Sequence, residues 1–230
     1  MSLLELDGVD AYYDQSRAIE DISFDVDQGE VLAMFGRNGA GKTTTLRSIV
    51  GVLYPRDGTV RFKSEDVTRT EKFERVQMGI GYVPEDRQVW SNLTVNENLS
   101  VPAGRGGERT IEEVYDLFPA LGELRGARAG TLSGGEQQML AMGRGLLGGT
   151  ELLLLDEPTE GLAPKIVADV REAITRLADE LTVVLVEQNI DLALSVANRV
   201  VVLANGELVH RSDADDLSAD DAVLRQHVSI

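Results

Sequence analysis

The 230-residue sequence contains no cysteine, which excludes disulfide bonds, thiolate metal sites and cysteine nucleophiles. It also has no continuous apolar stretch of the roughly 20 residues that a membrane-spanning helix needs. The first ten residues, MSLLELDGVD, carry acidic side chains where a signal peptide carries basic ones. We therefore expect a soluble, non-exported protein that is folded around one large core.

Positive charge is scarce, because 39 acidic residues oppose 22 basic ones and the formal net charge is −17. Lysine occurs only four times. A surface of this charge repels a phosphate backbone, so nucleic acid is not expected as a partner. An acidic surface that is poor in lysine also suits a cytoplasm of high salt, where screening removes the self-repulsion of the charges.

Three continuous apolar runs, at 31–35, 152–155 and 183–186, are typical of strands that are buried on both faces. Such strands occur in parallel sheets covered by helices, so the sequence predicts an α/β fold. Asn205 and Gly206 lie between two further apolar runs and predict a two-residue hairpin.

Apolar and polar residues alternate at 3–6, 22–26 and 59–62, which predicts short antiparallel strands with one exposed face. Apolar residues at helical spacing follow later, from Ile111 to Phe118. We place a helical insertion at about 86–147, so that 1–85 and 148–230 together form the sheet-containing core of one domain.

A segment with the pattern G-x-x-x-x-G-K-T follows the first apolar run. It consists of Gly36, Arg37, Asn38, Gly39, Ala40, Gly41, Lys42 and Thr43. The glycines let backbone N–H groups turn inward around a polyphosphate, and the helix that begins near Gly41 adds the positive end of its dipole. We expect Lys42 to meet the β- and γ-phosphates, Thr43 to bind Mg²⁺ and Thr44 to contact phosphate. The pattern predicts binding of ATP or GTP, whereas a simple glycine-rich turn would not need the flanking strand and helix.

Two carboxylates, Asp156 and Glu157, end the second apolar run. Ligands bind at the carboxyl edge of sheets of this kind. Asp156 can hold Mg²⁺ through its water shell, and Glu157 can orient or deprotonate the water that attacks the γ-phosphate. The alternative is that both acids simply end a strand before Pro158.

A second candidate anion site begins at Ser133, which can cap the helix that follows it. Gly134 and Gly135 expose backbone N–H groups at the start of that helix. An ordinary helix cap and turn would have the same sequence, so this segment becomes informative only beside the phosphate loop and the acid pair.

The order of the phosphate loop, LSGGEQQ and LLLLDEP resembles the ATP-binding cassette (ABC) family over nearly the whole chain. The resemblance implies a P-loop NTPase fold with a mixed parallel sheet core, an N-terminal antiparallel β subdomain and a helical subdomain insertion. It also implies that two cassettes pack head to tail, so that Ser133, Gly134 and Gly135 serve the ATP of the partner cassette. Tyr13 matches the aromatic residue that stacks on adenine, with Tyr12 as the competing choice.

Three positions depart from the usual family pattern. Glu85 stands where most cassettes have a glutamine that senses Mg²⁺ and the membrane partner, so it joins Thr43 and Asp156 as a candidate metal ligand. Gln188 replaces a histidine near the γ-phosphate, and Ala163 replaces an aspartate of the dimer contact. Either Gln188 donates an amide N–H in place of the imidazole, or this site hydrolyses ATP slowly.

The segments VPEDR, LSGGEQQML, EPTEGLAP and VEQN are similar to the LivF-type ATPase subunits of branched-chain amino-acid importers. That branch implies an ATPase with Lys42, Glu157 and Gln188 as its catalytic residues and ATP and Mg²⁺ as its cofactors. It acts at the cytoplasmic face of the membrane with a second cassette, as a heterodimer or a homodimer, and with two permeases. An extracytoplasmic binding protein would supply the solute, and Trp90 and Leu93 would face the permeases. The alternatives are a urea or amide importer, a non-transport cassette and a regulatory cassette with negligible turnover.

Overall fold

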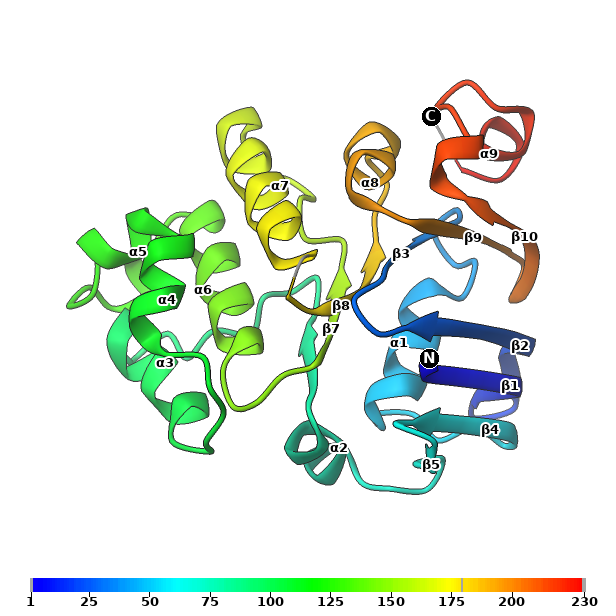
Figure 1. The fold of residues 1–230 in the computed structure, drawn as a ribbon, viewed down its shortest axis with the longest axis horizontal. Coiled ribbons are helices and arrows are strands. Elements are labelled where there is room, and N and C mark those ends of the chain that lie inside the picture. Colours follow the sequence, from blue (N-terminus) through cyan, green and yellow to red (C-terminus); the bar gives the residue numbers. More distant parts are fainter. Residues whose placement is uncertain (1, 179, 229–230) are drawn as a thin grey trace.

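The computed structural model describes residues 2–178 and 180–228 of the chain. It contains two β-sheets with helices packed around them (Figure 1). No helix in the described residues is long and apolar enough to cross a lipid bilayer.

The larger sheet has six strands in the order β10-β9-β3-β8-β7-β6. The strands are β3 (Val31–Phe35), β6 (Ile80–Val83), β7 (Leu152–Asp156), β8 (Thr182–Val186), β9 (Arg199–Ala204) and β10 (Glu207–Asp213). All neighbours pair in parallel except β10, which runs antiparallel to β9. Every residue of β3, β7 and β8 is buried, which confirms the interpretation of the three apolar runs.

The smaller sheet is antiparallel, with the order β2-β1-β4-β5. Its strands are β1 (Ser2–Tyr13), β2 (Ser16–Asp27), β4 (Asp57–Phe62) and β5 (Glu65–Asp66). Apolar residues of this sheet, among them Leu6 and Phe24, share one core cluster with Leu46 of α1 (Lys42–Val50) and Leu154 of the larger sheet. Helix α1 therefore packs between the two sheets, as Figure 1 shows in light blue.

The remaining helices lie on the other face of the larger sheet, on its edges and beside β6 (Figure 1). They are α2 (Lys72–Met78), α3 (Val95–Ala103), α4 (Ile111–Leu117), α5 (Pro119–Glu123), α6 (Gly134–Leu146), α7 (Pro164–Ala178), α8 (Ile190–Val196) and α9 (Ala222–His227). Helices α3 to α6 contact one another and form a group, drawn in green. Their apolar side chains belong to the same core cluster as those of α7 and of β3, β7 and β8. Because this core continues across it, the boundary at 86–147 remains a prediction.

Two local predictions are confirmed. Asn205 and Gly206 have φ values of 53° and 87°, the left-handed values that a tight hairpin turn between β9 and β10 requires, so the hairpin is confirmed. The helical pattern from Ile111 to Phe118 is confirmed by α4, which ends at Leu117 with Phe118 as its C-cap. Phe118 leaves the helix with φ −127° and ψ 77°, because a residue before proline avoids helical geometry, and α5 begins at Pro119.

Candidate active site

Three neighbouring parallel strands bring the candidate residues to one edge of the sheet. Strand β3 leads into the phosphate loop, β7 ends at Asp156, and β8 ends just before Glu187 and Gln188. Since β8 pairs with both β3 and β7, the carboxyl ends of all three strands meet there.

The backbone of the phosphate loop passes too close to its neighbours to carry side chains at two of its glycines. A Cβ atom on Gly36 would lie 2.5 Å from the carbonyl oxygen of Leu203, and one on Gly41 would lie 2.6 Å from Ile19. Gly41 also has a left-handed φ of 109° at the start of α1. The loop therefore rests directly on β9 and β2, which fixes its N–H groups beside the start of the helix.

Lys42 places its ammonium group inside this loop. The side chain is only 4% exposed, and Nζ donates to the carbonyl oxygens of Gly36 at 2.8 Å and Arg37 at 3.3 Å. The same nitrogen lies 3.4 Å from Oε1 of Glu157. The sequence thus brings the predicted phosphate-binding cation and the predicted general base into direct contact.

Asp156 accepts two hydrogen bonds at the end of β7. The Thr43 hydroxyl donates to Oδ1 and the Tyr82 hydroxyl donates to Oδ2, each at 3.1 Å. Burial raises the pKa of the Asp156 carboxyl, while both hydrogen bonds act to lower it. Burial and the Asp156 charge raise the pKa of Tyr82, so its phenol stays neutral and donates.

The oxygens of Thr43 and Asp156 are ligands of the kind that Mg²⁺ prefers. The described residues contain no group of three or more carboxylate or imidazole side chains arranged to hold a metal alone. This combination fits Mg²⁺, which commonly takes one or two protein ligands and completes its shell with substrate phosphates and water.

Glu157 is held from two sides. Its Oε2 accepts from Nε2 of Gln188 at 2.5 Å, and the same amide nitrogen is 3.4 Å from Oδ1 of Asn38. The backbone of Glu157 has a left-handed φ of 49°, and its N–H donates to the carbonyl oxygen of Val186 at 2.9 Å. Gln188 therefore stands between the acid and the phosphate loop.

Glu160 is a third carboxylate that the sequence analysis did not select. It lines the same cavity as Glu85 and Glu157. Its pKa is raised to about 7, first by a hydrogen bond with Glu157 and then by burial and by the charges of Glu157 and Glu85. A glutamate three residues after the predicted general base was the available signal.

These residues border a cavity of about 540 Å³. Tyr13, Arg17, Ala18, Asn38, Gly39, Gly41, Lys42, Thr43, Thr44, Glu85, Glu157, Glu160 and Asn205 line it. The Tyr13 ring is 42% exposed, and its hydroxyl accepts from Arg47 at 3.1 Å. The Tyr12 ring instead lies 4.1 Å from the guanidinium of Arg56. The geometry thus favours Tyr13 as the residue that meets an adenine, which stays a prediction.

Ser133, Gly134 and Gly135 begin α6 and are absent from the lining of this cavity among the described residues. Ser133 is the N-cap: its hydroxyl accepts from the Glu136 N–H at 3.4 Å, and its own N–H donates to the Glu136 carboxylate at 2.7 Å. The predicted helix cap is confirmed.

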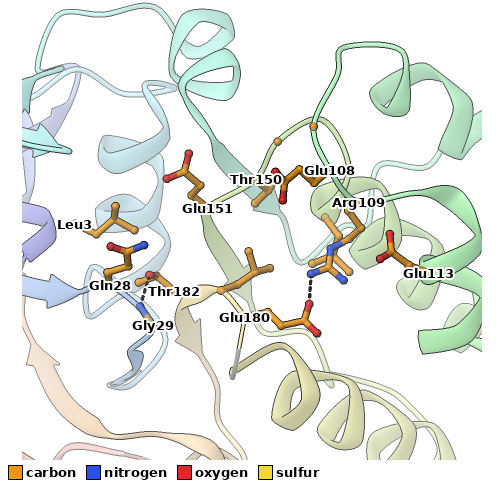
Figure 2. A pocket seen from close by; sticks show the side chains of 14 residues that line it. Leu3, Gln28, Gly29, Glu108, Arg109, Glu113, Thr150, Glu151, Glu180 and Thr182 are labelled. Carbon is orange, nitrogen blue, oxygen red and sulfur yellow. Dashed lines mark hydrogen bonds and ion pairs between the residues drawn. The ribbon is translucent and has the colours of Figure 1, made fainter.

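A second cavity, of about 730 Å³, lies at the opposite ends of β7 and β8 (Figure 2). Four glutamates line it: Glu108, Glu113, Glu151 and Glu180. Arg109 is paired with Glu180 at 2.5 Å, and Thr182 accepts from the Gly29 N–H at 2.9 Å. This negative lining opposes a polyphosphate, so the smaller cavity at the phosphate loop is the candidate nucleotide site.

Comparison with known proteins agrees with this assignment. A family model described as ABC transporter matches residues 19–160. The chain is 43% identical over 216 residues to the high-affinity branched-chain amino acid transport ATP-binding protein BraG of Pseudomonas aeruginosa, which covers 90% of this chain and 91% of BraG. It is 35% identical over 215 residues to the probable branched-chain amino acid transport ATP-binding protein LivF of Archaeoglobus fulgidus, with 91% of both chains covered.

A solved structure of a nucleotide-free ATP-binding cassette from an ABC transporter superposes with a TM-score of 0.85. The two chains are 24% identical, and 97% of each is covered, so this likeness bears on the fold. Together with the phosphate loop, the acid pair and the helix that begins after Ser133, these comparisons show that the chain belongs to the ABC transporter family and is one of its ATP-binding, ATP-hydrolysing subunits.

Proposed function

We propose that this chain is the ATPase subunit that powers an importer of branched-chain amino acids from the cytoplasmic face of the membrane. The observation that carries the ATPase part is the meeting of Lys42, Asp156, Glu157 and Gln188 at one edge of the sheet. The names of the relatives BraG and LivF support the choice of solute.

The chain supplies most of the groups that phosphoryl transfer to water needs. In this proposal Lys42 and the N–H groups of the phosphate loop bind the β- and γ-phosphates. The Gln188 amide, which donates to Glu157 and Asn38 in the structure, would donate to the γ-phosphate when ATP is bound. Glu157 orients the attacking water and accepts its proton. Mg²⁺ held by Thr43, Asp156 and Glu85 would neutralise charge on the phosphate oxygens.

The contact between Lys42 and Glu157 sets the order of these events. Their carboxylate–ammonium pair is buried, and a γ-phosphate on Lys42 takes the place of Oε1 as its anionic partner. Glu157 is then free to turn toward the water beside Gln188. In this proposal, binding of the γ-phosphate to the Lys42 ammonium group and release of Glu157 from that group are the same event.

A second cassette completes the site in this proposal. Ser133 is exposed, and neither Ser133 nor Gly134 nor Gly135 is among the described residues that line the cavity at the phosphate loop. In the assembled pair, the Ser133 side chain and the N–H groups at the start of α6 would contact the ATP of the neighbouring cassette. The partner is an unlike cassette of the same family, packed head to tail. Ala163, where many cassettes have an aspartate, lies in the loop that would meet that partner.

The permeases would bind an exposed apolar surface beside α2. Phe73 is 59% exposed and Tyr54 is 40% exposed, and both line a cavity of about 620 Å³. Arg105 also lines this cavity, and its charge acts on Arg144, whose guanidinium lies 3.7 Å from the ring of Trp90. Trp90, which is 39% exposed, is a further aromatic side chain that the cytoplasmic helices of the permeases would contact.

The test is reconstitution of the chain with its permeases, its second cassette and a solute-binding protein in lipid vesicles. ATP supplied on the side of the membrane that carries the cassettes should drive uptake of leucine, isoleucine or valine. Replacement of Phe73 by serine should weaken co-purification of the chain with the permeases. Uptake of urea or a short amide but not of leucine would overturn the choice of solute. ATP hydrolysis that no permease influences would overturn the transport role.

A further inference from the structure

Glu187 is a buried carboxylate that has no role in the ATPase mechanism proposed above. It follows β8 directly and is 2% exposed. Oε1 accepts from the Thr159 N–H at 3.0 Å and from its hydroxyl at 2.6 Å. Oε2 accepts from the N–H groups of Gln188 and Asn189, each at 3.1 Å.

The two oxygens therefore serve two different loops. Gln188 and Asn189 belong to the loop after β8, whereas Thr159 belongs to the loop after β7, 28 residues away in sequence. The same two loops meet a second time, where the side chain of Gln188 donates to Glu157. If Glu187 only stabilised the local turn at the end of β8, it would not accept hydrogen bonds from Thr159.

We propose that Glu187 is a positioning residue that fastens the loop of Glu157 to the loop of Gln188, so that the general base and the γ-phosphate donor approach ATP as one rigid unit. The inference rests on the proposed ATPase mechanism and adds a residue to it. Glu187 itself touches neither substrate nor metal ligand; it acts through Thr159 and through the backbone of Gln188.

The chemistry of the contacts requires a carboxylate. Both backbone N–H partners on Oε2 and the N–H on Oε1 can only donate, and a carboxylate accepts them all. Glutamine keeps one acceptor oxygen and presents N–H donors at the other position, which puts donor against donor at one loop. Burial raises the pKa of the Glu187 carboxyl, while the hydrogen bonds from Thr159, Asn189 and Gln188 act in the opposite direction.

The decisive variant is Glu187→Gln, measured in the full chain assembled with its second cassette and permeases. We expect kcat for ATP to fall about 10- to 100-fold, since the variant replaces hydrogen bonds to a charged acceptor by a donor that faces other donors. The KM and the Kd for ATP should stay within about threefold, because the phosphate loop is intact. Glu172→Gln, which changes an exposed carboxyl on α7, is the matched control and should leave kcat unchanged.

A double variant separates positioning from simple stabilisation. Glu187→Gln combined with Gln188→Ala should lose less activity than the product of the two single losses, because Gln188 is one of the two groups that Glu187 positions. Independent multiplication of the two losses, or a kcat of Glu187→Gln within twofold of wild type, would overturn the inference.

Folding defects do not obscure the result. If Glu187→Gln fails to assemble, Thr159→Val removes only the hydroxyl contact at 2.6 Å and should still lower kcat several-fold at unchanged KM. An unchanged kcat in Thr159→Val then counts against the clamp. Absence of ATPase activity in the wild-type complex would instead reject the proposed function, so the two failures are distinct.

Discussion

The ammonium nitrogen of Lys42 lies 3.4 Å from Oε1 of Glu157, and both side chains are more than nine-tenths buried. Each charge compensates the other, so removal of either one leaves a buried charge without its partner. In the proposed mechanism, the predicted phosphate-binding cation and the predicted general base would restrain each other until a polyphosphate separates them.

Replacement of Lys42 by alanine should weaken ATP binding at least 30-fold. Each lost hydrogen bond to a charged phosphate contributes about 1.5–3 kcal/mol, and 1.4 kcal/mol corresponds to a tenfold change in Kd. Titration calorimetry measures the effect directly. Lys63→Ala is the control, because that lysine pairs with Glu151 at 2.5 Å on the surface, far from the phosphate loop. Equal Kd values for the two variants would contradict the assignment.

Glu157→Gln should separate binding from hydrolysis. We expect kcat to fall by about 10²- to 10⁴-fold, the usual contribution of a general base. ATP affinity should be kept or increased, because a neutral amide competes less with phosphate for Lys42. Single-turnover hydrolysis and equilibrium binding of the same preparation test both statements. A variant that binds ATP more weakly and hydrolyses it normally would show that Glu157 has only a structural role.

Arg75 should be among the most costly residues to replace. Its side chain is fully buried, and the guanidinium donates to carbonyl oxygens at the end of α1, at Ser48 and Ile49, and to those of Thr68 and Thr70. Burial lowers its pKa to about 10. Arg75→Met leaves these oxygens unpaired and should cost about 3 kcal/mol of unfolding free energy.

For a chain of this size that loss corresponds to a fall of roughly 6–12 °C in Tm. Differential scanning calorimetry of Arg75→Met against Arg225→Met provides the measurement. Arg225 is 57% exposed in its pair with Asp220, so its replacement should change the unfolding free energy by no more than about 0.5 kcal/mol. Similar Tm values for both variants would refute a structural role for Arg75.

Glu160 should make the stability of the chain depend on pH. Its pKa is raised from 4.5 to about 7, so between these values the folded chain binds more protons here than the unfolded chain. The contribution of Glu160 to the free energy of unfolding is therefore fully present below about pH 4.5 and is lost as the pH rises to about 7. Glu160→Gln should flatten the decline of Tm between pH 5 and 8 in EDTA, whereas Glu172→Gln should not. Parallel profiles for wild type and Glu160→Gln would reject this cause.

The acidic composition leads to a prediction about salt. With a net charge of −17, self-repulsion should be strong at low ionic strength and should weaken as salt screens it. We expect Tm to rise as KCl increases from about 0.05 M toward molar concentration. A steady fall of Tm over that range would show that the composition is not an adaptation to high salt.

The sequence predicted those parts of the site that lie together in the chain. The phosphate loop and the pair Asp156 and Glu157 follow buried apolar strands directly, and parallel strands must bring their ends to one edge. The hairpin at Asn205 was equally local.

The missed residues act across distant segments. Tyr82 reaches Asp156 from β6, and Glu187 reaches Thr159 from the next loop, so no spacing in the sequence reveals either contact. Glu160 becomes notable through its hydrogen bond with Glu157 and the nearby charge of Glu85, and its spacing from Glu157 was the signal that the sequence offered.

Ser133 lies outside the cavity that contains Lys42, and this separation has a kinetic consequence for the proposed assembly. For free cassettes in dilute solution, turnover depends on encounters between the two unlike chains, so the total rate should grow with the product of their concentrations. When two cassettes are anchored on a common permease pair, each stays beside the other, so turnover no longer depends on their concentrations in solution. Damage at Ser133 would then silence the neighbour's turnover while the damaged copy keeps its own.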